Sequence, residues 1–222
     1  MASAITNCYD VSNSLGPTSY RLNFIEQYDG GTLQLLGMHG TSATRAAAIL
    51  ESRVFRIAEP VGDKPFGYGY GGRGAYFWAY EQDEDYGWQL ARSWWAFAHR
   101  KKDLYAGDAD CSCAVLGVEI SPPPEGKLLD ATEQLFREAL FQAMQNKKSN
   151  KQDLPEVTAV LIEEMEAANG DVFDVVKLHI ATPPVVSDEY KTYAQIVSRA
   201  SDAYLVKDTG LNLIGNIRII NR

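Results

Sequence analysis

The sequence has 222 residues, of which 45% are hydrophobic, 23% charged and 11% aromatic, and its formal net charge is −8. These values exclude a disordered or collagen-like chain, and no apolar run approaches the roughly 20 residues that a membrane span needs. The acidic balance removes the general attraction to phosphate on which most nucleic-acid binding depends, although it leaves room for a local basic groove.

Three cysteines occur, Cys8, Cys111 and Cys113, without a CxxC pair or a Cys/His pattern at metal spacing. This pattern argues against a disulfide scaffold and against a structural zinc site. The first 20 residues lack a basic start followed by an apolar core, so no secretory signal is expected. The sequence therefore predicts a reduced, cytoplasmic protein.

Short segments rich in β-branched or aromatic residues predict strands over 33–38, 74–78, 114–120, 173–180, 204–207 and 214–220. Helical spacing and start signals predict helices over 44–52, 86–101, 132–146, 154–169 and 187–201. Strands and helices come in clusters and do not alternate, which favours an α+β fold. We expect one domain over 1–222, with a helical insertion at about 131–170.

Aromatic side chains and glycines crowd together between residues 66 and 95. Glycine lets the backbone approach a ligand closely, and rigid rings supply stacking area. This composition favours a wall around a flat ligand, and an aromatic core beside a flexible turn is the alternative.

His39 lies in the segment GMHGTS (37–42), at the end of a predicted strand and just before a predicted helix. A side chain at a strand end can face a cleft, and Gly40 leaves its backbone amide open to a ligand. Thr41 and its neighbours offer hydroxyls at a helix N-terminus, where anions are also favoured. A structural histidine is the alternative interpretation.

A second segment, GRGAYFW (72–78), is a glycine-flanked turn that enters an aromatic strand. The two segments occur in this order, the first at the end of a strand before a helix and the second at the start of a strand. Together they resemble the ADP-ribosyltransferases of the diphtheria-toxin and poly(ADP-ribose) polymerase type, and especially bacterial toxin members. The resemblance is firm over 33–100, weaker over 114–130 and 200–220, and absent over 131–170. It implies a split sandwich of two small antiparallel sheets, with flanking helices, that grips NAD.

The resemblance also implies roles for particular residues. Gly40 would hold the nicotinamide amide through its backbone, His39 would bind the ADP-ribose portion with Thr41 nearby, and Tyr76 would stack on the nicotinamide ring. The second aromatic face would come from Tyr86 or else Trp88. We therefore expect His39, Gly40, Tyr76 and one of these two rings to converge on one pocket, and His39 and Tyr76 side chains on different faces would contradict the assignment.

The family's catalytic glutamate has no counterpart in this chain. In the matching segment SDAYLVKD (201–208), Ala203 takes its position, and Asp202 would point to the opposite face of the strand. Three interpretations stay open: an engineered Glu→Ala change, a natural pseudoenzyme, or a register shifted by one that makes Asp202 the catalytic carboxylate.

For two further histidines the sequence favours structural roles. His99 lies among basic residues near a predicted helix C-terminus and is interpreted as part of a solvent-exposed helix end. His179 follows an apolar strand and is interpreted as a residue that packs in the core. The acidic run 81–85 is interpreted as a solvated loop, or as a device against polyanionic acceptors.

The resemblance predicts an enzyme that cleaves the nicotinamide–ribose bond of NAD and transfers ADP-ribose to a macromolecular acceptor, protein or nucleic acid. No metal is implied. A toxin–antitoxin or anti-phage setting and an antitoxin partner would follow, with no membrane association. The rivals are an inactive transferase-like module that binds NAD or a protein, an RNA 2′-phosphotransferase, whose additional basic residues are not evident here, and an NAD hydrolase without an acceptor.

Overall fold

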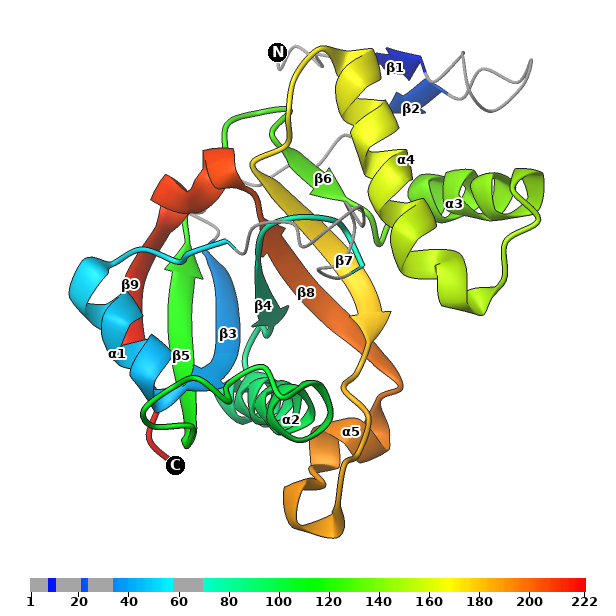
Figure 1. The fold of residues 1–222 in the computed structure, drawn as a ribbon. Coiled ribbons are helices and arrows are strands. Elements are labelled where there is room, and N and C mark those ends of the chain that lie inside the picture. Colours follow the sequence, from blue (N-terminus) through cyan, green and yellow to red (C-terminus); the bar gives the residue numbers. More distant parts are fainter. Residues whose placement is uncertain (1–7, 11–20, 24–33, 58–69) are drawn as a thin grey trace.

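A computed structural model describes residues 8–10, 21–23, 34–57 and 70–222. Within these ranges the chain forms an α+β fold around a seven-stranded sheet, shown in Figure 1. The order of the strands across the sheet is β6-β7-β8-β4-β3-β5-β9. Two short strands, β1 (Cys8–Asp10) and β2 (Arg21–Asn23), pair separately.

The strands of the large sheet match most of the segments that the sequence predicts. They are β3 (Leu35–Ser42), β4 (Ala75–Ala79), β5 (Cys113–Ile120), β6 (Leu128–Asp130), β7 (Val175–Ala181), β8 (Ala200–Val206) and β9 (Ile214–Ile219). All neighbouring pairs are antiparallel except β6 and β7, which are parallel.

The expected split into two small sheets is wrong for the described strands, because hydrogen bonding continues from β4 to β3. The connection is narrow, however. β3 and β4 are both described over their whole length and pair at two positions, Gly37↔Ala79 and Met38↔Trp78. The sheet is therefore continuous in its hydrogen bonding, but it consists of two halves that meet only at these two residue pairs. One half contains β9, β5 and β3, and the other contains β4, β8, β7 and β6.

The helices are α1 (Ala43–Ser52), α2 (Glu84–Lys102), α3 (Gln134–Asn146), α4 (Leu154–Asn169) and α5 (Tyr193–Val197), with 3-10 turns η1 (Lys151–Asp153), η2 (Asp188–Tyr190) and η3 (Asp208–Leu213). The side chain of Ser42 caps α1 by accepting from the amide of Arg45, so the helix starts earlier than predicted. Figure 1 shows α1 beside β5 and β9, α2 below the sheet, and α3 and α4 beside β6 and β7.

The predicted helix over 187–201 is wrong for most of its length. The chain instead forms η2, the five-residue helix α5 and then the start of β8. Thr192 and Gln195 form a reciprocal capping box that starts α5. Residues from Ala200 onward pair with β7, so the sheet ends the helix early.

Two apolar clusters cover the two faces of the sheet. One contains Met38, Trp78, Ala203 and Leu205 from the strands with residues of α2, α3 and α4, and we call this side the α2 face. The other contains Phe77, Leu116 and Val206 with Ala46 of α1, and we call it the α1 face. The helices of 131–170 therefore contribute to the main core, through Phe136, Leu161, Ile162 and Met165 among others.

Among the described residues, no helix is long and apolar enough to cross a membrane.

Candidate functional site

The candidate site lies where β3 and β4 stop pairing. Beyond Met38 and Trp78 the ladder between these strands ends, whereas β3 continues to pair with β5 as far as Ser42 and β4 with β8 as far as Ala75. The edge of β3 that follows Met38 and the edge of β4 that precedes Trp78 therefore face one another without a backbone ladder. We call these the unpaired edges. Backbone groups on such edges are available to a ligand.

His39 bridges the two unpaired edges. Its Nδ1 lies 2.9 Å from the carbonyl oxygen of Tyr76 on β4. A carbonyl oxygen can only accept, so Nδ1 carries the proton, and in the neutral ring Nε2 is then an acceptor. The imidazole thus replaces one backbone contact between the strands and keeps a lone pair for another partner.

The surroundings of His39 favour its neutral form. The ring packs edge-on against Phe55, with centroids 5.3 Å apart, and lies 5.7 Å from the ring of Phe77. Burial among these rings lowers the pKa of His39 below its usual 6.5, and the hydrogen bond to Tyr76 opposes the shift only in part. At neutral pH the ring is uncharged.

Gly40 faces α2 at very close range. A Cβ atom at this position would lie 1.8 Å from the carbonyl oxygen of Ala91. Glycine is therefore required here by helix packing, in addition to any contact between its backbone and a ligand. The segment GMHGTS predicts a ligand-binding role for Gly40, but the packing role depends on α2, which is distant in the sequence.

Tyr76 is held by the turn that precedes its strand. Its hydroxyl donates to the carbonyl of Gly72 at 2.8 Å and accepts from the amide of Gly71 at 3.1 Å. Burial raises the pKa of Tyr76 above its usual value, so the hydroxyl stays protonated. The contacts fix the ring on the α2 face, where it packs against the core cluster.

Tyr86, in the first turn of α2, reaches across to β8. Its hydroxyl lies 2.9 Å from Oγ of Ser201, a side chain that is 6% exposed. Trp88, two residues further on, packs against the same cluster and lies under the guanidinium of Arg92, 5.8 Å from its ring centroid. Both candidate aromatic residues thus belong to the α2 face.

Ala203 lies at the centre of that face. It stands opposite Trp78 of β4 and Leu178 of β7, and it is 1% exposed. Directly opposite residues of an antiparallel pair project to the same side, so Ala203, Trp78 and Met38 share one face. The position expected for a catalytic glutamate is therefore apolar and enclosed.

Asp202 points to the other side of β8, as the alternation of a strand predicts. Its Oδ1 lies 2.8 Å from Nδ1 of His179, and its Oδ2 lies 3.9 Å from Nζ of Lys177. The interpretation of His179 as packing is wrong, because its side chain is 55% exposed and bonded to this carboxylate. Strand β7 alternates buried and exposed residues here, and His179 falls on the exposed side.

Two other assignments also need correction. Thr41 is 3% exposed, and its side chain is hydrogen-bonded to Tyr105, so it does not line the unpaired edges as a free hydroxyl. His99 is not a solvated helix end, because its ring stacks on Trp95 with centroids 5.3 Å apart and planes 11° apart. Both residues face other aromatic side chains, which the helical and strand periods alone do not reveal.

The structure thus brings together part of the expected set. Gly40, Tyr76, Tyr86, Trp88 and Ala203 lie on the α2 face, whereas His39 lies on the α1 face and meets Tyr76 through its main chain. The expectation that the side chain of His39 converges on one pocket with Tyr76 and Tyr86 or Trp88 is therefore wrong, because the sheet lies between the imidazole and these rings. The aromatic and glycine residues over 58–69 that belonged to the expected ligand wall lie outside the described residues.

Among the described residues, no group of three or more His, Cys, Asp or Glu side chains could hold a metal ion. No model of a known protein family matches the chain. A comparison with curated proteins likewise finds no match.

Proposed function

We propose that this protein is an NAD-binding ADP-ribosyltransferase-like protein whose site lies at the unpaired edges of β3 and β4. The observation that carries the proposal is the break in the β3–β4 ladder, with His39 across it and with Gly40, Tyr76 and Tyr86 on one face beside it. The side chains of His39 and Tyr76 lie on different faces of the sheet, and this contradicts the assignment of both side chains to one nicotinamide pocket. The proposal therefore requires a ligand that lies at the edges and is reached from both sides.

Each group in the proposed site has a chemical task. The backbone of Gly40 would pair with the nicotinamide amide, since the edge of β3 beyond Met38 has no ladder with β4. The rings of Tyr76 and Tyr86 would stack on nicotinamide. Nε2 of His39, an acceptor in the neutral ring, would receive a hydrogen bond from a ribose hydroxyl.

Loss of nicotinamide leaves positive charge on the ribose C1′, which a carboxylate would stabilise in the transition state. Ala203 supplies none, and Asp202 lies on the opposite face, where it pairs with His179. The shifted-register interpretation therefore loses support. The remaining interpretations are an altered enzyme and a natural pseudoenzyme, and in both the protein would bind NAD and turn it over slowly or not at all.

The second candidate function is a catalytically inactive module that binds NAD or a protein partner. The enclosure of Ala203 between Trp78 and Leu178 favours it, because a glutamate at this position would need its neighbours to move. The two candidates agree on NAD binding and differ on what a restored carboxylate does.

Calorimetry with NAD tests the shared part. Tyr86→Ala should weaken NAD binding by about 1–3 kcal/mol, because it removes a stacking face from a confined site. Tyr193→Ala is the matched control, since Tyr193 is 77% exposed on α5. Absence of NAD binding by the unaltered protein, or equal effects of the two substitutions, would contradict the proposal.

Turnover of NAD separates the two candidates. Ala203→Glu should raise the rate of nicotinamide release by roughly 10²–10³ over Ala203→Gln, which has the same shape without the charge. Equal rates for the two variants, with NAD binding intact, favour the inactive module.

The cellular part of the proposal rests on the resemblance to bacterial toxins. It places the protein in the cytoplasm, in a toxin–antitoxin or anti-phage setting with a neutralising protein, and it involves no metal. Expression of Ala203→Glu in a bacterial host should be toxic where expression of Ala203→Gln is not.

A further inference from the structure

Helix α2 and the neighbouring turn η2 carry an unusual set of cations and rings. The guanidinium of Arg92 lies 5.8 Å from the ring centroid of Trp88 and 5.6 Å from that of Tyr190, and the guanidinium of Arg100 lies 5.4 Å from Tyr190. Nζ of Lys102 lies 5.3 Å from the ring centroid of Trp94 and 5.4 Å from that of Phe97. Five cation–π contacts thus gather on one helix, where a chain of this length would have about three in all.

The cations of this helix end form no ion pair with a described carboxylate, although Glu189 lies near enough to Arg100 for their charges to interact. Among the described residues, no carboxylate forms an ion pair with Arg92, Arg100, Lys101 or Lys102. Ion pairs are formed instead by cations elsewhere in the fold: Arg45, Lys127, Lys177, Lys207, Arg218 and Arg222. Arg100 instead donates to the hydroxyl of Tyr190 at 3.2 Å. Part of this charge suits the helix dipole, which favours cations in the last turn. That effect does not explain why Arg92, Arg100 and Lys102 lie beside aromatic rings.

Exposed cations interleaved with partly exposed rings are the combination that binds single-stranded nucleic acid. The cations pair with phosphates, and bases stack on aromatic faces without regard to sequence. A folded protein acceptor offers neither a regular row of phosphates nor unpaired flat bases. Double-stranded nucleic acid offers phosphates, but its bases are not free to stack on the rings.

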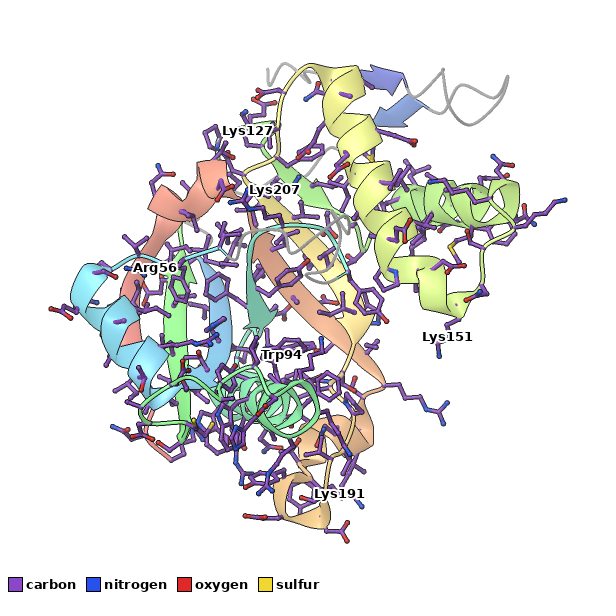
Figure 2. All side chains as sticks on the ribbon, viewed as in Figure 1. Arg56, Trp94, Lys127, Lys151, Lys191 and Lys207 are labelled. Carbon is purple, nitrogen blue, oxygen red and sulfur yellow. The ribbon has the colours of Figure 1, made fainter. Side chains whose placement is uncertain are left out.

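The position of this surface connects it to the proposed NAD site. Tyr86 is two residues before Trp88 on α2, and the row of contacts continues from Trp88 through Arg92 and Tyr190 to Arg100. At about 1.5 Å per helical residue, the row spans about 21 Å from Tyr86 to Arg100. Figure 2 labels Trp94 on the sheet side of α2 and Lys191, the residue after Tyr190, on the other side, so Trp94 does not belong to this row.

We propose that this α2 surface binds single-stranded nucleic acid and presents it to the NAD site as the acceptor of ADP-ribose. The acceptor role rests on the proposed function, whereas binding itself does not. The net charge of −8 and the acidic run 81–85, which directly precedes Tyr86, oppose the binding of a polyanion, so recognition would depend on the local cations of α2 and on stacking.

The test is fluorescence anisotropy with a labelled 12-nucleotide single strand, as DNA and as RNA, at 50 and 200 mM salt. Contacts to three to five phosphates predict that affinity falls about 20- to 130-fold between these salt concentrations. The triple variant Arg100→Glu/Lys101→Glu/Lys102→Glu should weaken binding about ten-fold or more at 50 mM salt. Tyr190→Ala, which keeps all charges and removes the ring beside Arg92 and Arg100, should weaken it by about five-fold or more.

The matched control is Lys147→Glu/Lys148→Glu/Lys151→Glu, which makes the same change of charge at three exposed lysines between α3 and α4. Figure 2 shows Lys151 on the α4 side of the molecule, away from α2. Circular dichroism of every variant checks folding, and Tyr190→Ala carries the test if the charge reversals unfold α2. The control should bind like the unaltered protein.

Failure of this inference is distinguishable from failure of the proposed function. No binding at 50 mM salt, equal loss in the control and the α2 variant, or stronger binding to a duplex of the same length would overturn it. In the Ala203→Glu background, transfer of label from NAD to protein, unaffected by the α2 variant, would also overturn it and make protein the acceptor. The affinity of the same variants for NAD, measured by calorimetry, should equal that of the unaltered protein. Absence of NAD binding would therefore contradict the proposed function and would leave the test of nucleic-acid binding unaffected.

Discussion

Nδ1 of His39 and the main-chain oxygen of Tyr76 lie 2.9 Å apart, although 37 residues separate them in the chain. The contact occurs at the first position where β3 and β4 no longer pair. An imidazole therefore spans two strands that a backbone ladder would otherwise join, and its own protonation is coupled to the integrity of that junction.

This coupling predicts a pH dependence of stability. The pKa of His39 is lowered in the folded protein by burial, so between that lowered value and the usual 6.5 the unfolded chain binds more protons than the folded one. The free energy of unfolding should therefore fall as pH drops through 6.5. Urea unfolding between pH 7.5 and 5 should show a steeper fall for the unaltered protein than for His39→Gln. Parallel pH profiles for the two proteins would contradict the lowered pKa.

The contact between Gly40 and α2 predicts a large effect of a single methyl group. In Gly40→Ala the new Cβ would overlap the main-chain oxygen of Ala91, which cannot rotate away as a side chain would. We expect a loss of about 3 kcal/mol in the free energy of unfolding, at the upper end for overpacking. Gly107→Ala is the control, because nothing lies within 4 Å of a Cβ there, and it should change stability by less than about 0.5 kcal/mol. Similar values for both substitutions would show that β3 and α2 are less closely packed.

The two hydrogen bonds of the Tyr76 hydroxyl predict that Tyr76→Phe lowers the free energy of unfolding even in the absence of a ligand. The substitution leaves the amide of Gly71, a buried residue, without its acceptor, and the carbonyl of Gly72 without its donor. Unfolding should become easier by about 1–3 kcal/mol. Tyr193→Phe, at an exposed tyrosine, should have no measurable effect by the same denaturant titration. If both substitutions are silent, the turn before β4 does not depend on this hydroxyl.

A buried ion pair attaches α4 to the end of β8. Nζ of Lys207 lies 2.6 Å from Oε1 of Glu166, with side chains 12% and 11% exposed, and the same oxygen accepts from the amide of Phe173. Glu166→Ala leaves a buried ammonium without its partner, so we expect a loss of about 3 kcal/mol. Asp208→Ala breaks the exposed pair with Arg73 and should cost less than about 1 kcal/mol. Thermal unfolding of both variants makes the comparison, and equal shifts would contradict the role of Glu166 as an anchor of α4.

Local patterns were sufficient for most elements of this fold. The period of apolar residues and the capping signals predicted α4 at its observed bounds and most strands to within a few residues, because these signals depend on neighbours in the chain. Strand alternation also predicted that Asp202 and Ala203 lie on opposite faces, and this prediction is confirmed.

Contacts between distant segments decided the rest. The helix predicted over 187–201 is cut short because residues from Ala200 onward gain backbone partners on β7, which a local propensity cannot anticipate. Contacts between side chains also decided the environments of two histidines. His99 was expected to be solvent-exposed but stacks on Trp95, and His179 was expected to pack in the core but lies on the exposed side of β7. The two-pair junction of β3 and β4, which separates the side chains of His39 and Tyr76, depends on how both halves of the sheet pack against α1 and α2, and no property of either strand's own sequence encodes it.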